Sequence, residues 1–411
     1  MLYELYELQR SLLAPMTALA QLGAAWWGEG PLSALPGAER VAAWYELLSR
    51  LSRTYEKPAF GLGETTLPSG ETVAVTERVA LERPFCRLVH FERTLPAERA
   101  PDPKILLVAP LSGHHATLLR DTVRRLLPEH EVWITDWTCA RQVPVEKGRF
   151  DLSDYVRYVQ EFLRHVGPGA HVVSVCQPTV PVLGAVSLMA TAGDPMLPRS
   201  MTLMGGPIDP RRSPTQVNAF ATTRPHAWFE RTLIHRVPDA YPGAGRRVYP
   251  GFLQLAGFVA MNPDKHFRSH WDYYRHLVEG DRESAAAHRR FYDEYNAVLD
   301  MTAEYYLETI RVVFQEHLLP RGAWRVGGVR VAPEDVRGVA LLTIEGELDD
   351  ISGAGQTHAA HDLCTGIDAA HKERFTAPGC GHYGIFSGRR WREEIYPRVR
   401  DFVRAHDGSE V

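Results

Sequence analysis

The sequence lacks several features that would point to particular classes of protein. No stretch approaches 18 uninterrupted apolar residues, so we expect no transmembrane helix. The 46 basic and 50 acidic residues give a formal net charge of -4, which leaves no basic field for binding nucleic acid. Met1 to Leu8 carry acidic side chains where a signal peptide carries basic ones, which predicts that the chain is not exported.

Cysteine is also scarce, and its spacing is irregular. The chain has 5 cysteines, none in a Cys-x-x-Cys pair: Cys86, Cys139, Cys176, Cys364 and Cys380. This pattern argues for a reducing cytosol and against a disulfide framework or a structural zinc site. His114 and His115 are adjacent, so they project to different sides, and no carboxylate stands at ligand spacing. We therefore expect no metal and no cofactor.

The chain has no Gly-x-Ser-x-Gly motif, but one stretch has the layout that this motif usually marks. The β-branched run 172–175 predicts a buried strand, and an apolar, helix-like run follows from Val180 to Met189. Cys176 stands at the corner between them, as a nucleophile does in a strand–turn–helix elbow. The alternative is a buried structural cysteine, because free cysteine is among the most buried residue types.

Strand and helix patterns alternate around this corner. The strands are expected at residues 105–109, 131–135, 171–175, 201–204, 339–344 and 372–376. Such alternation predicts an α/β fold with a mostly parallel sheet and right-handed crossovers. One of the intervening helices should be capped by Ser153 or Asp154 and run to His165. Reactive residues collect at the carboxyl ends of such strands, where Asp136 is expected only to cap its strand.

The remaining segments suggest four parts, 1–100, 101–210, 211–335 and 336–411. Residues 2–27 have apolar positions at helical spacing interrupted at Pro15; we expect them to pack on the core, with a surface-seeking helix as the alternative. A second helix at 38–55 and two strands within 72–94 follow. The aromatic-rich segment from 211 to about 332 breaks the alternation, which suggests a lid over the sheet; a separate all-helical domain is the alternative.

Three residues occur in the chain order nucleophile, acid, histidine that α/β-hydrolases use. Cys176 is followed by an acid pair, Asp349 and Asp350, after one strand, and by His382 in a glycine-flanked loop after the last strand. His382 would take the thiol proton, and the acid would orient the ring. One or both acids could instead only cap a helix. The backbone amide of Gln177, with that of Leu111 or Ser112, would form the oxyanion hole.

Four long blocks resemble the bacterial intracellular polyhydroxyalkanoate (polyhydroxybutyrate) depolymerases, and the resemblance covers essentially the whole chain. The blocks are residues 109–121, 174–181, 346–356 and 380–390. The resemblance implies an α/β-hydrolase fold, to which the segment 211–335 would add a helical, aromatic-rich cap, and a triad of Cys176, Asp349 and His382. It chooses Asp349 over Asp350 because the related polyester synthases have aspartate, a polar residue and then isoleucine, here Asp349-Asp350-Ile351.

The same resemblance implies a cytoplasmic enzyme that cleaves the polyester of storage granules through an acyl-cysteine. Water or a thiol such as coenzyme A could accept the acyl group. The alternatives are a polyhydroxyalkanoate synthase with the same triad and a non-catalytic protein of the granule surface. An aromatic, apolar groove would suit such a polymer, and the segment 211–332 could supply it.

Overall fold

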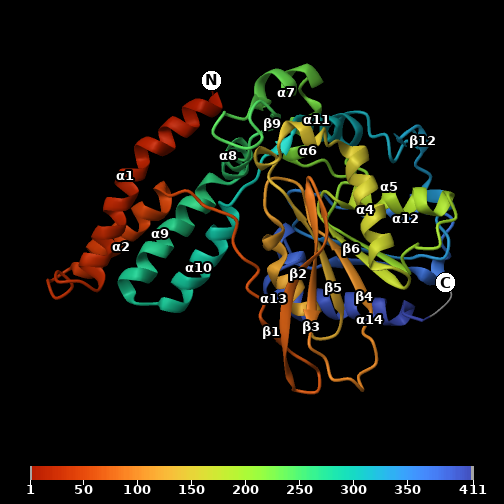
Figure 1. The fold of residues 1–411 in the computed structure, drawn as a ribbon, viewed down its shortest axis with the longest axis horizontal. Coiled ribbons are helices and arrows are strands. Elements are labelled where there is room, and N and C mark those ends of the chain that lie inside the picture. Colours follow the sequence, from red (N-terminus) through yellow and green to blue (C-terminus); the bar gives the residue numbers. More distant parts are fainter. Residues whose placement is uncertain (1, 409–411) are drawn as a thin grey trace.

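The computed structural model describes residues 2–408, and a nine-stranded sheet forms its centre (Figure 1). The strand order is β1-β2-β3-β5-β4-β6-β7-β13-β14. In chain order the strands are β1 (Glu64–Thr66), β2 (Thr72–Arg83), β3 (Cys86–Arg93), β4 (Lys104–Val108), β5 (Glu131–Trp137), β6 (Ala170–Val175), β7 (Ser200–Met204), β13 (Ala340–Gly346) and β14 (Lys372–Ala377).

The sheet is antiparallel at one edge and parallel through its middle. β1, β2 and β3 form antiparallel pairs, and β3 is antiparallel to β5. From β5 onwards every neighbouring pair is parallel. β6 and β7 are buried at every position, as expected for strands that are covered on both faces, and this burial explains their apolar sequences. The predicted α/β class with a mostly parallel sheet is confirmed.

Helices cover the parallel strands in two groups (Figure 1). α4 (Leu152–Val166) and α5 (Thr179–Thr191) contact each other and β6. In the second group, α3 (Arg120–Leu126) contacts α14 (Tyr396–His406); α3 also contacts β5, and α14 contacts β7 and β13. The expected cap of α4 at Ser153 or Asp154 is wrong, because the cap is Asp151, two or three residues earlier. Asp151 accepts from the Asp154 amide at 2.8 Å, and the Asp154 carboxylate accepts from the Asp151 amide, which closes a capping box.

Residues 211–332 form a cap that shares the core of the sheet domain. The cap includes α6 (Gln216–Thr222), α7 (His226–Leu233), α8 (Gly251–Met261), α9 (Pro263–Glu279), α10 (Arg282–Tyr295), α11 (Ala303–Thr309) and a small sheet of β8 (His235–Arg236), β9 (Arg247–Tyr249) and β10 (Met301–Thr302). Its Trp324 is buried against Gly184 of α5, where an added Cβ would lie 2.6 Å from the indole ring. The segment is therefore neither all helical nor separately packed.

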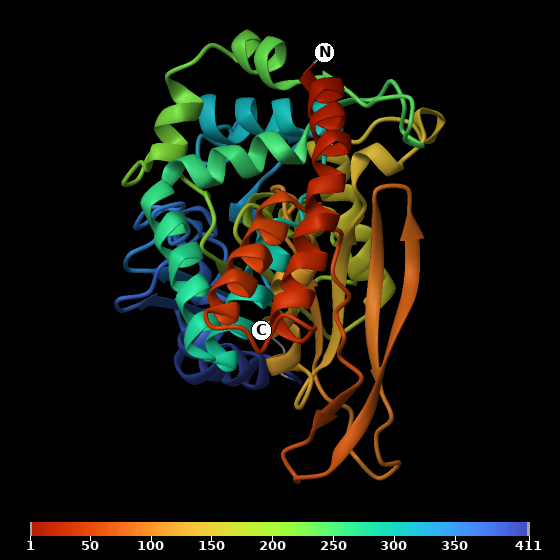
Figure 2. The same cartoon turned by 90° about the vertical axis from the view of Figure 1, so that its left-hand side faces the viewer.

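An α-helical arm stands at the left side of the molecule in Figure 1 and faces the viewer in Figure 2. It consists of α1 (Leu2–Gly28) and α2 (Ala38–Ser52), with α2 packed on α9. α1 continues through Pro15, and its large apolar side chains are exposed rather than buried. The expectation that this helix packs its apolar face on the core is therefore wrong. Its contacts use small residues instead: Ala20 is buried, and Gly23 lies against the ring of Tyr45.

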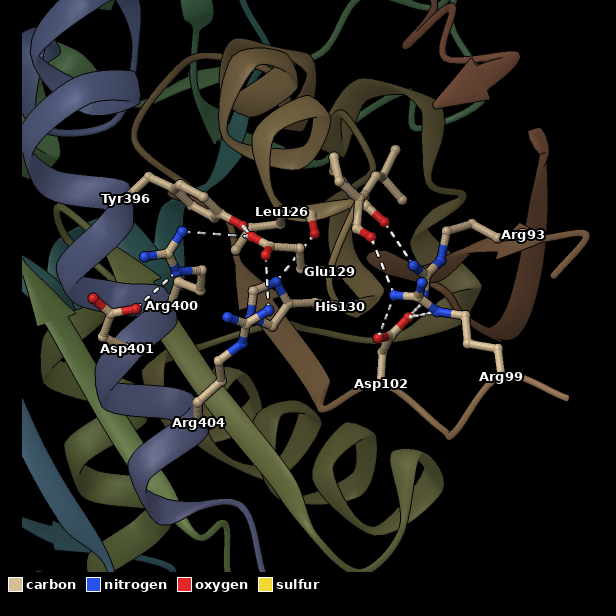
Figure 3. A network of polar contacts seen from close by, with 12 residues as sticks. Arg93, Arg99, Asp102, Leu126, Glu129, His130, Tyr396, Arg400, Asp401 and Arg404 are labelled. Carbon is tan, nitrogen blue, oxygen red and sulfur yellow. Dashed lines mark hydrogen bonds and ion pairs between the residues drawn. The ribbon is translucent and has the colours of Figure 1, made fainter. Parts of the chain in front are cut away.

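A network of charged side chains fastens α14 to the loop before β5 (Figure 3). Glu129 accepts from Tyr396 at 2.5 Å and from Arg404 at 2.7 Å. Beside it, the buried ring of His130 is hydrogen-bonded to the carbonyl of Leu126. This network lies at the amino end of β5, the edge opposite the carboxyl ends of the parallel strands. It therefore supports the fold rather than the candidate site.

Every helix within residues 2–408 is too short or too polar to cross a bilayer. The shorter elements complete the chain: β11 (Arg325–Val326) pairs with β12 (Val329–Arg330), and α12 (Ala360–Leu363) and α13 (Gly388–Arg390) lie in the last third.

Candidate active site

Cys176 lies on a sharp turn between β6 and α5, with a backbone φ of 70°. Only three non-glycine residues of the described chain have a positive φ, and this conformation costs an L-residue of the order of 1 kcal/mol or more. Surrounding contacts hold it in place. The Cys176 amide donates to the Met204 carbonyl at 2.7 Å, and a Cβ on Gly206 would lie 2.4 Å from the Cys176 carbonyl oxygen. The turn thus presents the thiol beyond the carboxyl end of β6.

His382 and Asp349 meet on the neighbouring loops. Nδ1 of His382 lies 2.7 Å from Oδ2 of Asp349, and both side chains are almost fully buried. The other carboxylate oxygen of Asp349 accepts from the backbone amides of Ile351 and Ser352 at 2.9 and 2.8 Å. This arrangement fixes the carboxylate and lets the Nδ1–H of the ring donate to it, which leaves Nε2 free to face another group. Asp350 is exposed and does not take part.

The electrostatics of His382 link it to both residues. Burial lowers its pKa, but the negative charges of Cys176 and Asp349, and hydrogen bonds to both, raise the pKa well above its usual value overall. The structure therefore brings Cys176, His382 and Asp349 together, although they are separated by up to 206 positions in the chain. Such a group can move a proton between sulfur and imidazole.

Gly205 allows this close approach. Its φ is +55°, and a Cβ at this position would lie 2.4 Å from Ile385 Cδ1 and 3.4 Å from both His382 and the Asp349 carboxylate. The end of β7 therefore passes close to the acid–histidine pair, and a side chain there would collide with Ile385 beside it.

The site opens into a cavity of about 680 Å³. Cys176 and His382 line it together with the three residues expected at the oxyanion hole, Gln177, Leu111 and Ser112. Gln177 stands two residues before the first residue of α5, so its backbone amide lies at the helix's positive end. The Gln177 side-chain amide is buried and has no hydrogen-bond partner in the described structure.

Most of the remaining wall comes from the cap and is apolar. α8 contributes Leu253 and Phe258, and α11 contributes Tyr305 and Tyr306. These residues could not be found from the sequence alone, beyond the general aromatic richness of 211–332, because the cap brings them to Cys176 only after folding. His114 also lines the cavity. Burial lowers its pKa to about 4, so its ring is neutral at ordinary pH, and its Nε2 lies 3.1 Å from the Tyr295 carbonyl.

Other sequence candidates lie outside this arrangement. Asp136 does not cap its strand: its buried carboxylate accepts from Lys57 and Arg87, each within 2.6 Å. No cluster of three or more His, Cys, Asp or Glu side chains suited to a metal ion occurs among residues 2–408. A second cleft, of about 850 Å³, lies between α9 and α10 and contains neither Cys176 nor His382. Four cysteines are buried, whereas Cys176 is partly exposed.

A known protein family matches the C-terminal part of the chain, which carries Asp349 and His382. Residues 205–407 match the family model described as PHB de-polymerase C-terminus. Through this segment the chain belongs to the PHB depolymerase family. The match begins at Gly205 and includes Asp349 and His382, whereas Cys176 precedes it. No curated protein matches the sequence.

Solved structures with a similar fold share little sequence with this family member. A monoacylglycerol lipase from Paleococcus ferrophilus is 13% identical, covers 74% of this chain and 96% of its own, and has a TM-score of 0.44. A 2-hydroxy-6-oxo-6-phenylhexa-2,4-dienoate hydrolase from a Rhodococcus strain is 12% identical, with 81% and 99% covered and a TM-score of 0.43. A Pseudomonas aeruginosa hydrolase is 14% identical, with 82% and 98% covered and a TM-score of 0.43. The fold assignment rests on the strand order and the turn at Cys176.

Proposed function

We propose that this protein is a depolymerase that cleaves the ester bonds of a stored polyhydroxyalkanoate, with Cys176 as nucleophile. Its membership of the PHB depolymerase family supports ester hydrolysis of such a polymer. The observation that carries the assignment is the strained turn at Cys176 facing the buried His382–Asp349 pair in one cavity. A strained backbone persists only where its surroundings enforce it, which is common at catalytic nucleophiles.

In the proposed reaction, His382 holds the proton of Cys176, and the sulfur attacks the ester carbonyl carbon. The resulting oxyanion accepts hydrogen bonds from the backbone amide of Gln177 and from that of Leu111 or Ser112. When the carbon–oxygen bond breaks, His382 returns its proton to the departing hydroxyl end, and an acyl-cysteine thioester remains. Water then attacks the thioester while His382 accepts one of its protons, and the Cys176 sulfur leaves. A thiol such as coenzyme A could replace water in this second step.

The cavity suits a polymer of apolar hydroxyacid units. Its walls are mostly aliphatic and aromatic. A chain of repeating esters could lie along the apolar wall while one carbonyl reaches the thiol. We further propose that the protein acts at the surface of cytoplasmic polyester granules, where such a polymer is found.

The experiment compares the native protein with Cys176→Ala on amorphous poly-3-hydroxybutyrate particles and on a soluble 3-hydroxybutyrate dimer. Cys176→Ala should fold normally but release no 3-hydroxybutyrate from either substrate, whereas Cys364→Ala, a change at a buried cysteine outside the cavity, should keep its activity. Release by Cys176→Ala equal to that of the native protein would refute the assignment.

The same preparations test the two alternative functions. Growth of polymer from 3-hydroxybutyryl-coenzyme A would identify a synthase instead. Binding to particles without any turnover by the native protein would identify a non-catalytic surface protein.

A further inference from the structure

The outer face of α1 is a continuous apolar stripe that nothing in the described structure covers. Its seven residues are each between 53% and 68% exposed, and they recur every three or four positions: Leu5, Leu8, Leu12, Met16, Leu19, Leu22 and Trp26. This spacing places them on one side of the helix, since positions three and four apart are neighbours. We call this set the α1 stripe. A single exposed leucine needs no explanation, but a row of seven marks an interaction surface.

The packing of the inner face of α1 on α2 explains why the large apolar side chains of the helix are exposed. Small residues make the contact with α2: Ala20 is buried, and Gly23 could not carry a Cβ without meeting the Tyr45 ring at 2.7 Å. Thr17 and Ser52 share a hydrogen bond of 2.8 Å across the two helices. Because the small side chains point inward, the helix turns its large side chains to solvent. This is the reverse of the pattern of a helix that packs its apolar face on a core.

The charge pattern of α1 narrows the choice of partner. From Ser11 to Gly28 there is no charged residue. Arg10, the one basic side chain of the helix, is engaged with Glu7 and Thr54. A helix that binds an anionic membrane usually carries lysines and arginines along its polar face, and α1 has none there. Its outer surface therefore matches an apolar partner that carries no net charge.

The stripe is also tied to the wall of the cavity. Tyr3 and Tyr6, near the start of α1, pack on Phe252 of α8 with ring centroids 5.4 and 4.0 Å apart. Tyr3 also donates to the buried carboxylate of Asp300 at 2.6 Å. The next residues of α8, including Leu253, line the cavity that contains Cys176. A surface bound along α1 is therefore held at a fixed distance from the site.

We propose that the α1 stripe docks the protein on the uncharged, apolar surface of its solid polyester substrate. This inference rests on the proposed function, because that function supplies a substrate that is a surface rather than a dissolved molecule. Leucine and methionine side chains would lie against the alkyl parts of the polymer. The indole N–H of Trp26 can donate to an ester carbonyl, as tryptophan does where an apolar phase meets a polar one.

The test changes the stripe without changing the site. Leu12→Gln, Leu19→Gln and Leu22→Gln together keep helix propensity, since leucine and glutamine are close on that scale. Combined with Cys176→Ala, which leaves the polymer intact, this triple variant should bind amorphous poly-3-hydroxybutyrate particles roughly 100-fold more weakly in a sedimentation assay, at about tenfold or less for each leucine. With Cys176 present, it should lose its rate on particles and keep its rate on the soluble dimer within about twofold.

A matched control makes the same kind of change elsewhere. Three valines with 49% to 52% exposure lie outside the arm, and replacing them together by glutamine should leave particle binding unchanged: Val79, Val145 and Val329. Circular dichroism and thermal unfolding check that both triple variants keep the fold.

Three results would overturn the proposal. The first is undiminished particle binding by the α1 triple variant. The second is equally tight binding of the parent protein to phosphatidylcholine or phosphatidylglycerol vesicles, which would make the partner a lipid. The third is a native dimer that the triple variant converts to monomers with particle binding intact, which would make the stripe an interface between two copies. If the native protein cleaves no soluble ester, the proposed function fails, while the sedimentation assay with Cys176→Ala still decides the docking surface.

Discussion

Replacing Asp349 by asparagine isolates the contribution of one carboxylate to the site. In the native protein its Oδ1 accepts two backbone amides and its Oδ2 lies 2.7 Å from Nδ1 of His382. Asparagine can keep its oxygen on the two amides, but its NH2 group then faces Nδ1, which must accept a hydrogen bond. The proton of a neutral ring moves to Nε2, so the ring can no longer take the proton of Cys176.

We expect kcat/KM on the soluble dimer to fall by roughly 1,000- to 10,000-fold, which is about 4 to 5.5 kcal/mol of transition-state stabilisation at about 1.36 kcal/mol per factor of ten. Stability should change in a pH-dependent way. The pKa of His382 is raised above that of the unfolded chain, so its charge stabilises the native state fully below about pH 6.5, and this stabilisation is lost as the pH rises through the folded-state value. Asp349→Asn should therefore be most destabilised relative to the native protein just below pH 6.5.

Asp350→Asn is the matched control, because it makes the same chemical change one residue away at an exposed side chain. The Asp350 carboxylate accepts one long hydrogen bond, from the Asn262 side chain at 3.4 Å. The initial rates of Asp350→Asn should match those of the native protein within about twofold, and its free energy of urea unfolding should match within about 0.5 kcal/mol. If the two variants lose activity equally, or if only Asp350→Asn is inactive, the assignment of Asp349 to His382 is refuted.

Three further changes test other parts of the structure. Gly205→Ala should lower the free energy of urea unfolding by about 1–3 kcal/mol more than Gly61→Ala, since both glycines have a positive φ but only at Gly205 does the new Cβ meet other atoms; equal losses would contradict this. Gln177→Met should raise that free energy by about 1–3 kcal/mol, because it removes a buried side-chain amide that has no hydrogen-bond partner within residues 2–408. It should keep ester hydrolysis, because the proposed mechanism uses the backbone amide; a destabilised variant would show that the side-chain amide has a partner in solution. His130 has a folded-state pKa of about 4, below its ordinary 6.5, so the native state resists its protonation and loses stability as the pH falls from about 6.5 to about 4; His130→Phe should remove about 3 kcal/mol of this loss, measured by unfolding at both pH values.

The sequence was most informative where local pattern and tertiary role coincide. The apolar runs near residues 105, 172 and 340 became central strands, because a strand covered on both faces must be apolar at nearly every position. Cys176 could be placed at a corner because a strand pattern ended abruptly before it and a helical pattern began after it. The order of Asp349 and His382 along the chain then suggested their loops.

Two of the failures came from contacts between residues that are distant along the chain, and a third came from two capping residues close together in sequence. The apolar spacing of α1 shows that its large side chains share one face, but not whether that face is buried or exposed. The small residues that pack on α2 decide this, because they leave the large side chains on the outer face. The aromatic richness of 211–332 gave no sign that the chain leaves α10 after Tyr295 and buries Asp300 against Tyr3 and the Gly251 amide. No periodicity encodes such a partner. The cap of α4 was misplaced because aspartate is a good capping residue at both 151 and 154. The reciprocal hydrogen bonds show that Asp151 is the N-cap and that Asp154 is the third residue of the helix.

The five thiols differ in burial, so a thiol reagent can distinguish Cys176 from the other four. Cys86, Cys139, Cys364 and Cys380 are at most 7% exposed, whereas Cys176 can be reached from the cavity. A mild alkylating reagent applied to folded protein should therefore add a single label, and the labelled fraction would report how many molecules in a preparation are competent. For the same reason, peroxide should oxidise Cys176 first, and if Cys176 is the nucleophile as proposed, this oxidation should abolish ester hydrolysis while the fold stays intact.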